Sequence, residues 1–110
     1  MLKARIVVLL SGNGSNLQAL IDACQAGSLP AEIVAVISNK AEAFGLSRAS
    51  RAGLKTLVVP FDKSMRRVDY DHSLAEVVAS FAPDWVILAG WMRILSNAFL
   101  ASFPNKVVNL

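Results

Sequence analysis

Continuous apolar runs alternate with helix-like spacings along this chain. A run that is apolar at every position predicts a strand buried on both faces, whereas apolar positions three and four residues apart predict an amphipathic helix. The predicted strands are Ile6–Leu10, Ile33–Ile37, Leu57–Val59, Trp85–Ala89 and Lys106–Leu110. The predicted helices are Leu17–Cys24, Phe44–Ala52, Tyr70–Phe81 and Ser96–Ser102.

Residues at the predicted helix ends support these boundaries. Gly27 and Gly53 follow the first two helices, where glycine is the most common C-terminal residue. Pro83 ends the third, because proline cannot continue a helix. Ser96 is expected to cap the N-terminus of the fourth with its hydroxyl group.

The order of these elements, βαβαβαβαβ, predicts an α/β fold. We expect a doubly wound, open parallel sheet with helices on both faces and right-handed crossovers, in the Rossmann-like strand order 3-2-1-4-5. No linker or repeat interrupts residues 1–110, so a single domain is expected. In such a sheet ligands bind beyond the carboxyl ends of the strands, here where strands 1 and 4 lie side by side.

A glycine-rich first loop, Ser11–Asn16, follows strand 1 and opens the first helix. Its glycines allow a tight turn and the close approach of a ligand. The N–H groups and dipole of the helix N-terminus favour an anion, and Ser15 and Asn16 add side-chain donors. A dinucleotide fingerprint would need glycine in place of Leu17 and an acid in place of Ser38–Lys40, and no Walker A lysine is present. The loop therefore fits a single phosphate group, or it is only a turn that caps a helix.

A second loop, Ala89–Leu95, follows strand 4. Its glycine suggests that the backbone lies close to a ligand or to another backbone segment. Arg93 is suited to an anionic ligand, although core packing with Arg93 in a structural ion pair explains the pattern equally well. The apolar side chains that suit the wall of a pocket are Trp91, Met92, Ile94 and Leu95.

Three further polar residues were weighed as candidates. Asn109 lies at the end of strand 5, and this strand is predicted to be buried. A carboxamide at this position can donate a hydrogen bond to a developing oxyanion. A strand-end asparagine is, however, commonly a turn former. His72 is expected to face solvent, away from the apolar stripe of its helix, and Cys24 to be a small core residue. One histidine and one cysteine offer no metal site.

The net charge and the hydropathy of the chain limit the kinds of binding partner that we expect. The net charge is +3, and the basic residues are scattered apart from the adjacent Arg66 and Arg67, so we expect no nucleic-acid partner. No apolar run approaches the length of about 20 residues that a membrane span needs, and no signal peptide is recognisable, so no membrane partner is expected. The lone cysteine suits a reducing compartment, and a cytoplasmic location is expected.

Taken together, the loops resemble those of the phosphoribosylglycinamide formyltransferase family, also called the glycinamide ribonucleotide transformylases, over the whole chain. The resemblance implies formyl transfer from 10-formyltetrahydrofolate, the cosubstrate, to the amine of glycinamide ribonucleotide in purine synthesis, with no metal. The segments that carry the resemblance are Ile6–Leu20, Ser38–Ala41, Phe44–Leu46 and Leu88–Ser96.

The same resemblance implies a role for particular residues. In the family pattern Arg67 aligns with an arginine that contacts the folate, with Arg66 beside it leaving the alignment uncertain by one position. Asn109 aligns with the asparagine that stabilises the tetrahedral intermediate. The phosphate-binding residues are Gly14, Ser15 and Asn16, and the folate-binding residues are Met92, Arg93, Ile94 and Leu95, together with Arg67.

The family continues past Leu110 with a histidine, the expected partner in proton transfer, and with an aspartate some tens of residues later. We therefore expect residues 1–110 to be a truncated N-terminal, ribonucleotide-phosphate-binding domain that is inactive alone. Strand 5 would then be an exposed sheet edge, favouring self-association or binding of a complementing C-terminal fragment. The alternatives are a non-catalytic phosphate-binding or structural fragment, or another folate-dependent enzyme such as methionyl-tRNA formyltransferase or formyltetrahydrofolate hydrolase, which the first loop argues against.

Overall fold

A five-stranded, all-parallel sheet forms the centre of the molecule, and its strand order is β3-β2-β1-β4-β5. This order confirms the prediction. The computed structural model describes residues 3–110. The strands are β1 (Ala4–Leu10), β2 (Ala31–Ser38), β3 (Thr56–Val58), β4 (Trp85–Leu88) and β5 (Val107–Asn109). The helices are α1 (Ser15–Gln25), α2 (Phe44–Arg51), α3 (Arg67–Ala79) and α4 (Asn97–Leu100).

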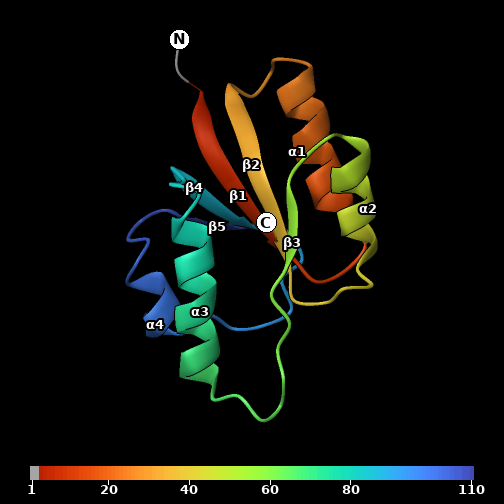
Figure 1. Cartoon of the computed structure of the whole chain (residues 1–110). Helices are drawn as coiled ribbons and strands as arrows, with labels where there is room; N and C mark the ends of the chain where they lie inside the picture. Colours follow the sequence, from red (N-terminus) through yellow and green to blue (C-terminus); the bar gives the residue numbers. More distant parts are fainter. Residues whose placement is uncertain (1–2) are drawn as a thin grey trace.

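Helices cover both faces of the sheet. Figure 1 shows α1 and α2 together on one side and α3 and α4 together on the other. Because a right-handed crossover leads from each strand to its parallel neighbour, the reversal of direction after β3 puts the later helices on the opposite face. The result is a three-layer α/β sandwich, the doubly wound arrangement that the sequence predicts.

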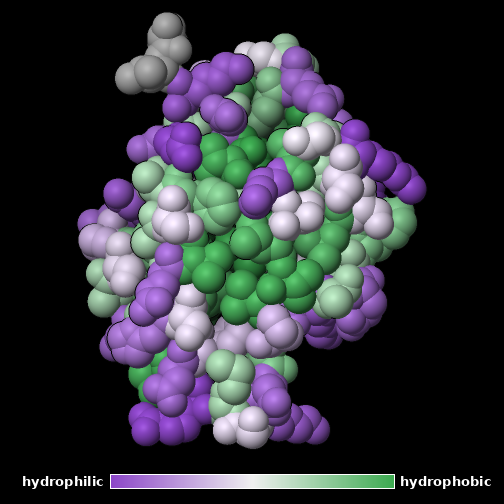
Figure 2. Space-filling view, viewed as in Figure 1, coloured by the Kyte–Doolittle hydropathy of each residue, from purple (hydrophilic) through white to green (hydrophobic). Residues whose placement is uncertain are grey.

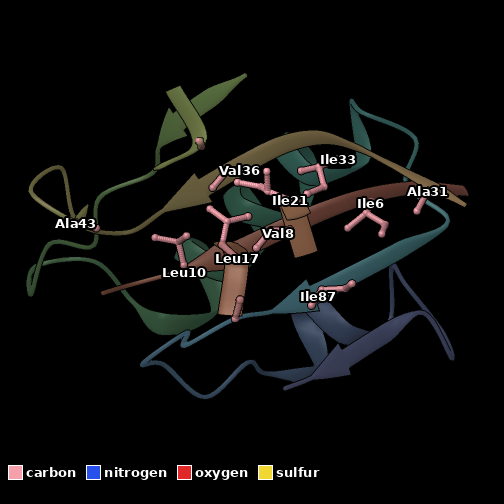
Figure 3. Packing of buried hydrophobic residues seen from close by; sticks show 12 residues of the cluster. Ile6, Val8, Leu10, Leu17, Ile21, Ala31, Ile33, Val36, Ala43 and Ile87 are labelled. Atoms are coloured by element: carbon pink, nitrogen blue, oxygen red, sulfur yellow. The ribbon is translucent and has the colours of Figure 1, made fainter. Parts of the chain in front are cut away.

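The alternation of side chains along β1 divides the core into two clusters. Ile6, Val8 and Leu10 belong to the cluster beneath α1 and α2, which Figure 3 shows from close by. Val7 and Leu9 belong to the cluster beneath α3 and α4. All five side chains are buried. Full burial of such a side chain stabilises the fold by about 1.5–3 kcal/mol, which explains why the run is apolar at every position.

Several element boundaries differ from the predictions. β1 begins at Ala4, ahead of the apolar run, because its parallel pairing with β2 already starts opposite Ala31. α3 begins at Arg67, ahead of the apolar stripe that starts at Tyr70. α4 is a single turn, Asn97–Leu100, and is shorter than predicted. For β1, pairing with the neighbouring strand, rather than the apolar pattern, decides where the element begins.

Gly27 and Gly53 end α1 and α2 as predicted. After α1, the Gly27 N–H donates to the Cys24 carbonyl (3.2 Å) and the Ser28 N–H to the Ala23 carbonyl (3.1 Å). These two bonds make a Schellman motif, which satisfies carbonyl groups that the helix end leaves free.

The two sheet edges are only partly covered. β5 pairs with β4 on one side only, and Val108 and Leu110 are 38% and 57% exposed, so β5 is the exposed sheet edge expected for residues 1–110 and not the buried strand that its apolar pattern alone predicts. At the other edge β3 pairs with only the last part of β2, Val36–Ser38. Figure 2, drawn from the same side as Figure 1, shows apolar side chains at the centre of the molecular surface, over the region where Figure 1 places β2 and β3. Among residues 3–110, no helix is long and apolar enough to cross a membrane.

Candidate active site

The first and second loops meet at the carboxyl edge of the sheet, as predicted. β1 pairs with β4 up to Leu9 and Leu88, and the Ser11 N–H then donates to the Gly90 carbonyl (3.0 Å). A cavity of about 220 Å³ lies between the two loops. It is lined by Gly12, Asn13, Gly14, Ser15, Asn16, Ala89, Gly90 and Met92.

The first loop leads directly into the N-terminus of α1. Asn13 Oδ1 accepts the N–H of Ser15 (2.9 Å), and the Gln18 N–H starts the helical ladder at the Gly14 carbonyl (2.9 Å). The first N–H groups of a helix have no partner within the helix. Those of Asn16 and Leu17 are therefore the donors that α1 can offer to an anion in the cavity.

Gly14 is required by the turn and by packing, a constraint that the sequence alone did not reveal. It has a φ of +78°, and a Cβ at this position would lie 2.6 Å from the Cα of Gly45 in α2. A Cβ on Gly12, by contrast, would meet nothing within 4 Å. The tight contact is therefore between the first loop and α2.

Further contacts from α2 hold the first loop in place. The Gly45 N–H donates to the Gly12 carbonyl (3.0 Å), and Arg48 Nε donates to the Asn13 carbonyl (2.7 Å). Sequence reasoning did not identify Arg48. No local pattern marks it, because the contact joins residues 35 positions apart.

The side chains of the second loop point in two directions. Met92 and Ile94 are 77% and 79% exposed. Trp91 and Leu95 are partly buried and pack against the cluster beneath α3 and α4. Of the four side chains in the predicted apolar wall, Met92 and Ile94 therefore face outwards, whereas Trp91 and Leu95 pack against the core and hold the loop backbone in place.

Arg93 packs on aromatic rings and forms no ion pair within residues 3–110, so the core packing of the structural alternative is found there without its ion pair. Its guanidinium carbon lies 3.6 Å from the centroid of the Phe61 ring and 4.9 Å from that of Tyr70. The ion pair found among residues 3–110 joins Arg66 to Asp69 at 3.6 Å. Arg93 Nε is buried and has no hydrogen-bond partner in the described part of the chain.

Tyr70 is fully buried beneath Arg93. Burial raises the pKa of its phenol to about 12, while the positive charge of Arg93 acts in the opposite direction. The hydroxyl donates to the Val59 carbonyl (2.6 Å). Tyr70 is therefore a neutral support for Arg93 at physiological pH.

Arg67, and not Arg66, is in contact with the second loop. Its Nη2 atom donates to the Ile94 carbonyl (2.6 Å). The Arg66 side chain is 77% exposed and pairs with Asp69. The structure thus separates two neighbouring arginines that the sequence could not distinguish.

Asn109 lies at the same edge but further along it. It pairs with Leu88 in the β4–β5 ladder, and its residue is exposed. The residues that line the cavity do not include it. Asn109 therefore lies further along the edge of the sheet, whereas the first loop and Met92 enclose the cavity.

Two buried polar residues that sequence reasoning missed support the loops. Ser11 is 3% exposed; its hydroxyl donates to Asn39 Oδ1 (2.7 Å) and accepts the N–H of Met92 (2.9 Å). Asp71 is 1% exposed and accepts hydrogen bonds from Ser96. The prediction that the Ser96 hydroxyl caps α4 is therefore wrong, because this hydroxyl donates to Asp71 instead. A signal for Asp71 existed, because it follows Tyr70 within the apolar stripe of its helix.

The remaining candidates lie away from this edge. His72 is exposed on α3, as predicted. Cys24 is partly buried against the first core cluster, and burial raises the pKa of its thiol. Within residues 3–110, no three His, Cys, Asp or Glu side chains gather as metal ligands do. A larger cavity, about 650 Å³, opens at the amino end of the strands, where Arg5 donates to the Phe81 carbonyl.

The fold and the site define a Rossmann-like α/β domain with a glycine-rich loop and a cavity at the carboxyl edge of its sheet. The chain belongs to the formyl transferase family, whose profile matches residues 4–110. It is similar to phosphoribosylglycinamide formyltransferase of Escherichia coli K12, with 49% identity over 105 residues, covering 96% of this chain and 50% of the relative. It is also similar to the human trifunctional purine biosynthetic protein adenosine-3, with 46% identity covering 98% of this chain and 11% of that protein.

Solved structures give the same result. Glycinamide ribonucleotide transformylase 1 from Symbiobacterium toebii superposes with a TM-score of 0.93 at 42% identity, covering 97% of this chain and 50% of that structure. The chain thus spans about half the length of the bacterial relatives it matches. The resemblance predicted from the loops is confirmed.

Proposed function

We propose that this protein transfers the formyl group of 10-formyltetrahydrofolate to the amine of glycinamide ribonucleotide, giving formylglycinamide ribonucleotide and tetrahydrofolate. One observation carries the proposal. A loop suited to phosphate faces an exposed apolar residue, Met92, across a cavity of about 220 Å³, in a chain that is 49% identical to a phosphoribosylglycinamide formyltransferase.

The ribonucleotide phosphate binds at the N-terminus of α1 in this proposal. Gly14, Ser15 and Asn16 hold it, through helix N–H groups and the side chains of Ser15 and Asn16. The lining of the cavity by all three residues supports this assignment. A phosphate at this position directs the rest of the ribonucleotide along the carboxyl edge, towards β4 and β5.

The folate binds against the second loop in this proposal. Met92, Ile94 and Leu95 contact the ring system, and Arg67 and Arg93 lie beside them. The exposure of Met92 and Ile94 supports it, because large apolar side chains exposed together often mark a binding surface. Stacking on Phe61 holds the Arg93 guanidinium in one orientation.

Asn109 is the proposed catalytic residue of this chain. The substrate amine attacks the formyl carbon, a C–N bond forms, and the carbonyl oxygen becomes an oxyanion that the Asn109 carboxamide stabilises by donating a hydrogen bond. The intermediate then loses the bond to the folate nitrogen, and the proton of the amine passes to that nitrogen through an acid–base group. Loss of one oxyanion donor costs about 10²–10³ in kcat.

We propose that the acid–base group is a histidine, assisted by an aspartate, outside residues 1–110, as the family resemblance implies. The only histidine of these residues is His72, which is exposed on α3. Residues 1–110 are then the ribonucleotide-binding domain and have no useful activity when assayed alone. General acid–base catalysis typically contributes about 10²–10⁴ in rate.

A mixing experiment tests these proposals together. Formyl transfer is measured with residues 1–110 alone, and then with a fragment that begins at the His-Pro segment of the family added. Activity only after mixing supports the proposed reaction and the divided site. Binding of glycinamide ribonucleotide without turnover in either tube would instead favour the non-catalytic phosphate-binding alternative. Turnover by residues 1–110 alone would contradict the proposed need for a further segment.

We also propose that the β5 edge of residues 1–110 binds another protein segment, either a complementing fragment or a second copy. The unpaired side of β5 and the exposure of Val108 and Leu110 support this. Light scattering that finds only a monomer, together with no effect of the complementing fragment, would contradict it. A cytoplasmic location is proposed from the lone cysteine and can be checked by cell fractionation.

A further inference from the structure

Asp71 is a buried carboxylate that the proposed chemistry does not use. It lies in the first turns of α3 and is 1% exposed. The ion pair found among residues 3–110 involves Asp69 and not Asp71. A buried charge is costly unless hydrogen bonds or an opposite charge compensate it, so the groups that face Asp71 explain why it is there.

Both hydrogen bonds to Asp71 come from one residue. Its Oδ2 atom accepts the backbone N–H of Ser96 at 2.8 Å and the hydroxyl of Ser96 at 2.6 Å. Hydrogen bonds to an ionised carboxylate are shorter and stronger than neutral ones. Ser96 directly follows the second loop, so Asp71 fixes the end of that loop to α3.

Two neighbours on the same face of α3 contact the loop as well. Arg67, Tyr70 and Asp71 are three and four positions apart, a spacing that places side chains on one helix face. Arg67 donates to the Ile94 carbonyl, and the Tyr70 ring lies 4.9 Å from the Arg93 guanidinium carbon. The start of α3 thus holds the second half of the loop at three points.

The other end of the second loop is held by Ser11, the residue that follows β1. The Ser11 hydroxyl accepts the N–H of Met92, and the Ser11 N–H donates to the Gly90 carbonyl. The backbone is therefore fixed at both ends, while Met92 and Ile94 project outwards, 77% and 79% exposed. A loop fixed in this way binds a ligand without first having to be ordered.

We propose that Asp71 is a positioning residue for the folate cosubstrate: it holds the second loop in the conformation that binds the folate, and touches neither substrate. The inference rests on the folate-binding role proposed for the second loop. It predicts that loss of the carboxylate weakens binding of 10-formyltetrahydrofolate and leaves binding of glycinamide ribonucleotide unchanged, because the first loop has its own supports on α2.

The test compares Asp71→Asn and Ser96→Ala with Asp69→Asn as the matched control. Asp69 lies in the same helix, but its carboxylate is exposed and pairs with Arg66. In the full-length protein, Asp71→Asn is expected to raise KM for 10-formyltetrahydrofolate about tenfold, the effect of losing one charge-assisted hydrogen bond. KM for glycinamide ribonucleotide should not change. Ser96→Ala, which keeps the backbone N–H, should have a smaller effect in the same direction.

Amide hydrogen exchange provides a readout that needs no activity. The Ser96 N–H donates directly to Asp71, so its exchange should accelerate about tenfold in Asp71→Asn and not in Asp69→Asn. Unchanged exchange at Ser96, or an equal rise of both KM values, would overturn the inference. If the wild-type protein shows no formyl transfer, the proposed function fails by itself, and exchange at Ser96 alone still decides whether Asp71 orders the loop.

Discussion

Gly14 and Gly45 touch backbone to backbone, since a Cβ on Gly14 would lie 2.6 Å from the Cα of Gly45. Two segments separated by a whole βα unit therefore meet where neither has a side chain. This contact brings α2 against the first loop and fixes the position of the N-terminus of α1. The orientation of the proposed phosphate site thus depends on a helix that does not line it.

Gly14→Ala should destabilise the protein strongly. The substitution adds the strain of a positive φ, about 1–2 kcal/mol, to a clash with the Gly45 backbone that cannot be relieved by a side-chain movement. Urea denaturation measures the loss in the free energy of unfolding. Gly12→Ala is the matched control, because a Cβ there meets nothing within 4 Å. Equal effects of the two substitutions would show that the helix contact is not the cause.

Ser11→Ala should destabilise the protein and loosen the second loop together. It leaves two part-buried groups without this partner, the Met92 N–H and the Asn39 carboxamide oxygen, and about 1–3 kcal/mol for a fully buried group is the upper bound for each. Thermal unfolding should show a lower Tm, and the Met92 amide should exchange faster. Ser102→Ala, at an exposed serine, should change the free energy of unfolding by no more than about 0.5 kcal/mol. A wild-type Tm for Ser11→Ala would contradict the inferred network.

Phe61→Leu should weaken the hold on Arg93. The substitution keeps an apolar side chain but removes the aromatic face that lies 3.6 Å from the guanidinium carbon. A partly buried cation–π contact contributes about 0.5–2 kcal/mol to stability. A double-mutant cycle with Arg93→Met measures this coupling by denaturation. Additive effects of the two substitutions would mean that the stacked geometry contributes nothing to stability.

Stability should fall in alkali as Tyr70 ionises. Burial raises its pKa to about 12 in the folded protein, above the ordinary tyrosine value of 10.0 that holds for the unfolded chain. The stabilisation is therefore fully present below pH 10 and is lost as the pH rises through about 12. Tyr70 is the only tyrosine in the chain, so tyrosinate absorbance reports its titration directly. Tyr70→Phe should remove this part of the pH dependence, and titration near the ordinary tyrosine value of 10.0 would contradict the prediction.

The apolar pattern was sufficient to predict the sheet, because short runs that are apolar at every position, such as Ile6–Leu10, are typical of strands buried on both faces. It did not predict where β1 begins, since Ala4 and Arg5 join the strand through pairing with β2. The same limit applies to the site. The first loop and Met92 were identified from local sequence, whereas Ser11 and Asp71 take their roles from partners 81 and 25 positions away.

Consecutive residues of β1 are subject to separate constraints, since Val7 packs under α3 and α4 while Val8 packs under α1 and α2. Substitutions at the two positions share no side-chain partner in the core, so their energetic effects should add even though the residues are adjacent in sequence. During evolution the helix pair on one face of the sheet can therefore accumulate compensating changes without disturbing the other. The sheet therefore keeps two sets of core contacts independent of each other, whereas a fold with helices on one face only would combine them in a single core.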